Sequence, residues 1–214
     1  MKQNFYILFT FFICVLILYA LKVEAVLPLT GKTIVIDAGH GAEDPGTNYN
    51  KIYEKDINLN IALYLEKELG SLGAEVLLTR DGDYDLSKPD ATYRKKSDFD
   101  NRIKFINESN ADLYISIHLN YLSDSSYYGP QIFYTKDNKD IAENIQNSMN
   151  VDLEGDRQIK KIPNDTYMYN KLNISGVLIE CGFLSNAKER SLLQTSEYQI
   201  KVAKSIAKGI VQYF

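Results

Sequence analysis

The stretch at residues 32–46, KTIVIDAGHGAEDPG, decides the fold of this 214-residue chain. Its β-branched apolar residues at 33–36 predict a buried strand, which ends at Asp37. Small residues and glycines then form a turn around His40. The stretch therefore predicts a buried strand that delivers a histidine at its carboxyl end.

Two later stretches have the same design. Residues 113–120, LYISIHLN, carry His118 at the end of an apolar run, and residues 176–183, GVLIECGF, carry Glu180. The chain has only two histidines, and each lies just past a predicted strand. Ligands of open parallel sheets gather outside the carboxyl ends of the strands. Two imidazoles and a carboxylate placed there could share one metal ion.

Composition limits the classes of protein to which the chain could belong. A length of 214 residues with 45% hydrophobic residues predicts one domain with a single core. The net charge is -4, the pI is about 5.3 and no basic stripe occurs, so we expect no nucleic-acid partner. Of the two cysteines, Cys14 lies in an N-terminal apolar run, so Cys181 has no partner for a disulfide within the folded body.

The N-terminus carries an apolar run at residues 5–21, followed by the small-residue pair Val23 and Ala25. This pattern predicts a secretory signal peptide cut near Ala25, with an uncleaved membrane anchor as the alternative. Residues 1–25 are therefore expected to form the signal peptide or anchor, and residues 26–214 the folded domain. Either way, we expect the domain to lie outside the cytoplasmic membrane.

Strand and helix patterns alternate along the body. We predict strands at 33–36, 75–80, 113–120, 131–135 and 176–183, and helices at 56–72, 97–110, 139–150, 187–193 and 198–213. This order predicts a single α/β domain, with a mostly parallel central sheet flanked by helices on both faces.

The third metal ligand is left open by spacing alone. With both histidines used, it must be a carboxylate, and the nearby choices are Glu43, Asp44, Glu54 and Glu180. Glu54 would equally suit the first turn of the following helix, where the helix dipole favours an acid. Both histidines could also be ordinary hydrogen-bonded residues.

A hydrolytic metal site also needs a carboxylate that does not bind the metal and can accept a proton from water. Glu180 suits this role because its apolar surroundings would raise its pKa. Cys181 is adjacent, but its side chain is expected on the opposite face of the strand, which disfavours a cysteine nucleophile. HExxH, GxSxG and Walker motifs are absent.

At these residues the sequence resembles the zinc-dependent N-acetylmuramoyl-L-alanine amidases of the Amidase_3 type. The resemblance extends from residue 32 to residue 214. The matching pieces, in order, are IVIDAGHGAEDPG, YEKDINLNIALYLEKEL, EVLLTRDGD, RIKFINESNADLYISIHLN and GVLIECGFLSNAKE. The resemblance implies that His40, Glu54 and His118 bind one zinc ion and that Glu180 is the catalytic acid/base.

The resemblance also implies a reaction and a substrate. Amidases of this type hydrolyse the amide bond between the lactyl group of N-acetylmuramic acid and L-alanine in peptidoglycan. The short body after an apolar N-terminus is most similar to germination-specific spore-cortex amidases, whose action precedes the formation of muramic δ-lactam. This similarity implies export to the wall or to the spore intermembrane space.

Three further residues receive weaker predictions. Asp37 and Asn120 would hydrogen-bond to the histidines and orient them, or would simply form turns. Arg102 matches a position of the family pattern, with a solvent-exposed charge on a helix as the alternative.

Two other functions compete with the amidase. One is a zinc exopeptidase acting on peptidoglycan stem peptides, and the other is a non-catalytic wall-binding module that uses some of the sixteen tyrosines. The presence of both histidines and both glutamates of the pattern argues against the module. Because wall-binding repeats are missing, we expect delivery by a membrane anchor or an accessory protein.

Overall fold

A computed structural model describes residues 9–12, 26–135 and 138–214. The predicted signal peptide or anchor at residues 1–25 lies almost wholly outside the described residues. Among the helices that are described, none has both the length and the apolar character needed to cross a membrane.

The described residues form one six-stranded sheet with the strand order β4-β1-β5-β8-β6-β7. The strands are β1 (Thr33–Ala38), β4 (Glu75–Leu78), β5 (Leu113–Asn120), β6 (Gln131–Tyr134), β7 (Lys160–Lys161) and β8 (Gly176–Phe183). Strands β4, β1, β5 and β8 are parallel, and β6 runs antiparallel to β8. The prediction of a mostly parallel central sheet is confirmed.

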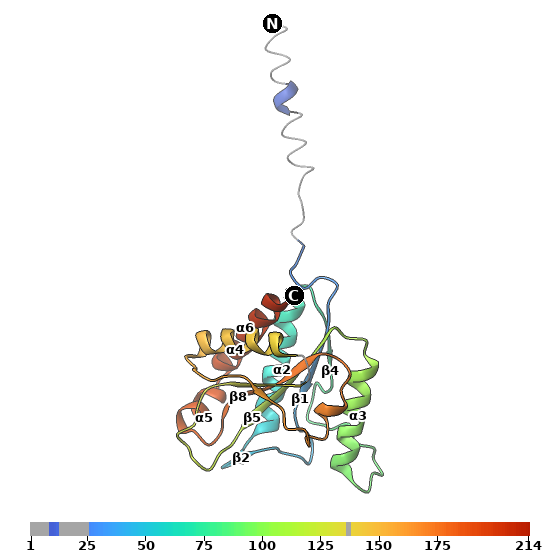
Figure 1. The fold of residues 1–214 in the computed structure, drawn as a ribbon, viewed down its shortest axis with the longest axis vertical. Coiled ribbons are helices and arrows are strands. Elements are labelled where there is room, and N and C mark those ends of the chain that lie inside the picture. Colours follow the sequence, from blue (N-terminus) through green and yellow to red (C-terminus); the bar gives the residue numbers. More distant parts are fainter. Residues whose placement is uncertain (1–8, 13–25, 136–137) are drawn as a thin grey trace.

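Helices cover both faces of the sheet, as predicted (Figure 1). On one face lie α2 (Glu54–Ser71), α4 (Lys139–Leu153) and α6 (Ser196–Tyr213), and α6 packs against both α2 and α4. The other face carries α3 (Arg94–Glu108) and the short 3-10 helix η1 (Tyr169–Lys171). Helix α5 (Ala187–Leu193) contacts β8 and α6.

Alternation along the strands assigns each side chain to a face. In β1, Ile34 and Ile36 join the core beneath α2, α4 and α6, whereas Val35 joins the smaller core beneath α3. In β8, Cys181 lies in the larger core. The prediction that Cys181 points away from the face carrying Glu180 is therefore confirmed, and the thiol is buried.

The chain enters α2 differently from the prediction. Residues 48–53 contain a small hairpin of β2 (Asn48–Tyr49) and β3 (Ile52–Tyr53), which the sequence did not predict. The amide of Glu54 donates to the Thr47 carbonyl at 2.9 Å, so the hairpin leads directly into the helix. The helix predicted from residue 56 therefore begins at Glu54. Strands of two residues are too short to produce an alternating pattern, which explains the error.

Candidate metal centre and active site

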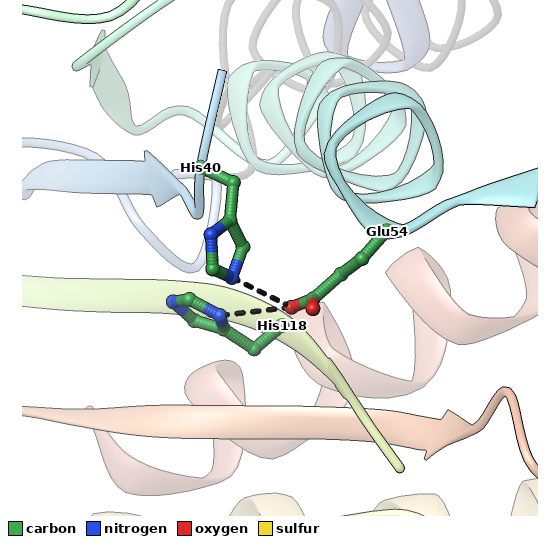
Figure 2. Close-up of side chains that lie close together, drawn as sticks. All are labelled: His40, Glu54 and His118. Atoms are coloured by element: carbon green, nitrogen blue, oxygen red, sulfur yellow. Dashed lines mark hydrogen bonds and ion pairs between the residues drawn. The ribbon is translucent and has the colours of Figure 1, made fainter. Parts of the chain in front are cut away.

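Three side chains converge at the carboxyl edge of the sheet (Figure 2). His40 follows β1, Glu54 is the first residue of α2, and His118 lies near the end of β5. One ligand atom from each residue lies within 4.8 Å of the other two. These are the three residues that the family resemblance implied, although their role as metal ligands remains a prediction.

Both imidazoles point at the same carboxylate oxygen, as Figure 2 shows. Glu54 Oε1 is 3.2 Å from His40 Nε2 and 3.0 Å from His118 Nδ1. The two rings meet edge to face, with centroids 5.0 Å apart. Two imidazole nitrogens and one carboxylate oxygen form a donor set that catalytic zinc sites use, with one coordination position left open. The residues present therefore fit a zinc ion.

The Glu54 carboxylate is held from several sides. Its Oε1 accepts from the Leu119 amide at 3.0 Å and from Asn58 Nδ2 at 3.2 Å, and its Oε2 accepts from the Thr47 amide at 2.8 Å. Burial alone would raise the pKa of Glu54, but hydrogen bonds from the two histidines lower it far below the ordinary value. The carboxylate is therefore fixed and ionised.

The turn after β1 is tight because two glycines make room for the site. A Cβ atom on Gly39 would clash with the His118 ring, and one on Gly46 would clash with Glu54 and with the His40 ring. Gly46 also has a φ of +65°, which glycine adopts without strain. The glycines of the motif thus allow the two histidines and the glutamate to approach.

Two buried arginines hold the same turn through its carbonyl groups. Arg80 Nε donates to the Ala38 carbonyl at 2.8 Å, and its Nη2 donates to the Gly39 carbonyl at 2.9 Å. Arg102 Nη1 donates to the Ala38 carbonyl at 2.8 Å, and its Nη2 donates to the His40 carbonyl at 2.7 Å. His40 has a φ of +65°, a strained conformation for a residue with a side chain. The arginines hold it in that conformation.

The alternative of a solvated charge at Arg102 is wrong, because the residue is 1% exposed. It forms ion pairs with Asp37 at 2.7 Å and Asp98 at 2.9 Å. Burial alone would raise the pKa of Asp37, but the Arg102 guanidinium and the Ser116 hydroxyl bring it below the ordinary value. Ile106, four residues further along α3, is also buried, so Arg102 lies on the packed face of the helix.

We expect Arg102→Met to destabilise the protein by about 3–5 kcal/mol, because it leaves the buried Asp37 carboxylate without its cation. Lys104→Met, on the exposed side of the same helix, should change stability by less than about 0.5 kcal/mol. Chemical denaturation of the two variants makes the comparison. Equal midpoints would show that the buried pair contributes nothing.

Asp44 lies beside the site without joining the group of three. Its Oδ2 accepts from His40 Nδ1 at 2.9 Å, on the opposite side of the ring from Glu54. Burial alone would lower the pKa of His40, but hydrogen bonds to Asp44 and Glu54 raise it to about 9. Asp44 therefore orients His40, a role that the sequence analysis had not assigned to it.

Glu180 projects into the same region from β8. It is the register partner of His118 in the neighbouring parallel strand. Its Oε2 is buried and has no hydrogen-bond partner among the described residues. Burial and the nearby Glu54 carboxylate raise the pKa of Glu180 from 4.5 to about 8. A carboxyl group with a buried, unpaired oxygen and this pKa is typical of a proton-transfer group.

This shift makes the stability of the metal-free protein depend on pH. Between pH 4.5 and 8 the Glu180 carboxyl ionises in the unfolded chain but stays protonated in the folded one, so stability falls as pH rises. Glu180→Gln removes this loss of stability, because glutamine does not ionise. We expect the metal-free variant to be more stable than wild type at pH 8 by several kcal/mol, because one pKa unit corresponds to about 1.4 kcal/mol. Denaturation at pH 4 should show no such gain, and an equal gain at both pH values would contradict the assignment.

The residues of the candidate site lie in an open groove of about 400 Å³. His40, Glu54, His118 and Glu180 line it, and the exposed Tyr121 lines it as well. A groove that is open to solvent can admit a chain-like substrate. The four residues named by the family resemblance therefore face one common space.

The remaining predicted residues contact the histidines less directly. Asp37 reaches neither ring, and its Oδ2 accepts from the Ser116 hydroxyl at 2.8 Å. The Asn120 side chain accepts from the Tyr121 amide at 2.8 Å, which is turn chemistry, and its orienting role stays a prediction. Tyr169, which the sequence analysis missed, places its hydroxyl 3.1 Å from His118 Nε2. No local pattern around residue 169 could have signalled this contact.

Known proteins share both the sequence pattern and the fold. Residues 34–212 match the Amidase_3 family, described as N-acetylmuramoyl-L-alanine amidase. The germination-specific N-acetylmuramoyl-L-alanine amidase of Bacillus subtilis is 42% identical over 195 residues, covering 88% of this chain and 82% of that protein.

Solved structures agree. The CwlD amidase of Clostridioides difficile, determined in complex with the GerS lipoprotein, matches with a TM-score of 0.81 at 42% identity, covering 85% of this chain and 98% of that one. The catalytic domain of CwlV from Bacillus (Paenibacillus) polymyxa matches with a TM-score of 0.74 at 33% identity, covering 85% and 97%. The resemblance inferred from the motifs is thus confirmed, and the chain belongs to the Amidase_3 family of N-acetylmuramoyl-L-alanine amidases.

Proposed function

We propose that this amidase cuts the bond between the lactyl group of N-acetylmuramic acid and L-alanine, with His40, Glu54 and His118 as ligands of one zinc ion. Glu180 is the catalytic acid/base. The observation that carries the proposal is the unpaired, buried Glu180 oxygen, in the same groove as the three convergent ligand atoms. We also propose that residues 26–214 form the catalytic domain.

Zinc at this site would supply a Lewis acid and an activated water. The protein's own residues hold and transfer one proton. Glu180, ionised when a cation is near, accepts the proton of the attacking water through its free oxygen. When the carbon–nitrogen bond breaks, the same carboxyl group returns that proton to the alanine nitrogen. The leaving group is then a neutral amine, and Glu180 is again a carboxylate.

The proposed setting is the spore cortex, outside the cytoplasmic membrane. The name of the Bacillus subtilis relative assigns that protein to germination, and the Clostridioides difficile amidase was solved with a lipoprotein partner. By analogy, this chain would strip stem peptides from cortex glycan before muramic δ-lactam forms. An N-terminal anchor or an accessory protein would hold it at the membrane. Spores that lack the protein should have no muramic δ-lactam, and normal δ-lactam content would refute this role.

The chemical test is the identity of the products. An amidase releases stem peptides with a free N-terminal L-alanine and leaves the glycan intact. An exopeptidase leaves the lactyl–alanine bond in place. A wall-binding module releases nothing.

A further inference from the structure

We propose that Tyr169 is a positioning residue, which fixes the His118 ring in the form that offers Nδ1 to the metal. The inference rests on the proposed function, because it assumes that His118 is a zinc ligand. It adds a residue from a distant segment of the chain to the site. It also assigns a direction to a buried chain of hydrogen bonds.

The two nitrogens of His118 face different partners. Nδ1 is 3.0 Å from Glu54 Oε1, on the side where the three ligand atoms converge. Nε2 is 3.1 Å from the Tyr169 hydroxyl. A ring nitrogen that binds a metal carries no proton, so the other nitrogen must carry it and needs an acceptor. Tyr169 is therefore the acceptor of the Nε2–H group.

The Tyr169 hydroxyl can accept this hydrogen bond because it donates its own proton to a further acceptor. Its hydroxyl lies 3.1 Å from Ser116 Oγ, and the Ser116 hydroxyl donates to Asp37 Oδ2 at 2.8 Å. An ionised carboxylate only accepts, so it sets the direction of the whole chain. The protons point from His118 through Tyr169 and Ser116 to Asp37. Arg102, at 2.7 Å from Asp37 Oδ1, keeps that carboxylate ionised.

The residues that form this chain of hydrogen bonds are buried. Tyr169 is 7% exposed, Ser116 is fully buried and Asp37 is 1% exposed. The tyrosine ring belongs to the smaller core, with Met168 and Leu172 of its own segment. A ring fixed in this way holds its hydroxyl in one place. Removal of the hydroxyl would leave the Nε2–H group without the hydrogen-bond partner that it has among the described residues.

The two histidines are thus oriented in different ways. His40 presents Nε2 to Glu54, and Asp44 of its own turn holds the Nδ1 side. His118 presents Nδ1, and a tyrosine 51 residues further along the chain holds the Nε2 side. Each ring therefore offers one nitrogen to the metal and has the other fixed by a partner.

The test compares Tyr169→Phe with Tyr167→Phe. Both changes delete one hydroxyl from the same segment, but the Tyr167 hydroxyl donates to Asp100 and does not contact a histidine. We expect Tyr169→Phe to weaken zinc binding by about 10–100-fold, which is the usual effect of removing a residue that hydrogen-bonds to a metal ligand. Zinc affinity is measured by competition with a chelator. Tyr167→Phe should bind zinc as wild type does.

Nitrogen-15 NMR of the zinc-loaded protein gives a readout that is independent of activity. With only two histidines in the chain, wild type should show two ring N–H signals: Nε2–H of His118 and Nδ1–H of His40. In Tyr169→Phe the His118 N–H signal should shift, or disappear because its proton exchanges faster with water. The His40 signal should remain and serves as the internal control.

An unchanged zinc affinity and an unchanged His118 signal in Tyr169→Phe would overturn the inference. Equal weakening of zinc binding in both tyrosine variants would overturn it too, because the loss would then come from a disturbed segment and not from the lost contact with His118. If Tyr169→Phe fails to fold, Ser116→Ala takes its place: it should weaken zinc binding, and wild-type affinity would refute the chain of hydrogen bonds. If wild type itself binds no zinc, the proposed function fails instead.

Discussion

Glu180→Gln is expected to lower the rate of amide cleavage by about 10²–10⁴-fold, the usual contribution of a general acid/base. Glutamine keeps the size of the side chain but cannot accept the proton of the attacking water. It also cannot return a proton to the alanine nitrogen. The measurement is the rate at which peptidoglycan releases peptides with a free N-terminal L-alanine.

Zinc affinity distinguishes a lost proton acceptor from a damaged site. Glu180 is not among the three converging ligands, so the variant should still bind zinc, but less tightly than wild type, because it lacks the carboxylate whose ionisation the cation favours. Glu143→Gln, an equivalent change on the exposed surface of α4, should leave the rate unchanged. A Glu180 variant that keeps full activity would remove this residue from the mechanism.

Glu54→Gln should weaken zinc binding by more than the roughly 100-fold that loss of an outer hydrogen-bond partner produces. The change removes both a ligand oxygen and the negative charge that faces the two histidines. Activity at low zinc concentration should fall in parallel. Zinc affinity is measured by chelator competition and zinc content by elemental analysis.

Two other carboxylates of the same region provide a graded comparison. Asp44→Asn weakens the hold on His40 Nδ1 but removes no ligand, so zinc affinity should fall by about 10–100-fold. Glu43→Gln, at an exposed position of the turn, should have no effect. Zinc binding that survives in Glu54→Gln but is lost in Glu43→Gln would show that the ligand set is wrong.

The sequence was most informative where residues report on backbone geometry. The apolar runs before His40, His118 and Glu180 correctly predicted β1, β5 and β8, whose carboxyl ends meet at one edge. Only His40 lies past its strand, because β5 and β8 continue beyond His118 and Glu180. The order of strands and helices predicted the layered architecture correctly. Spacing could not choose among the acidic residues near His40, because four carboxylates lay close enough. The fold brings Glu54 into the group through a hairpin too short to leave a pattern.

The missed features depend on contacts between distant segments. For Arg102 the sequence left a solvated charge as an alternative, because its buried partners Asp37 and Asp98 meet it only in the folded chain. Tyr169 lies 51 residues from His118 in a segment with little regular structure, and sixteen tyrosines offer no reason to select one. Such residues acquire their roles only when the chain folds.

The most direct measurement is mass spectrometry of peptidoglycan treated with the zinc-loaded protein and, in parallel, with the chelated protein. We expect free stem peptides that begin with an unblocked L-alanine, and glycan strands with unsubstituted lactyl groups, in the zinc-loaded sample alone. Cleavage only within the peptides, or equal release after chelation, would contradict this expectation.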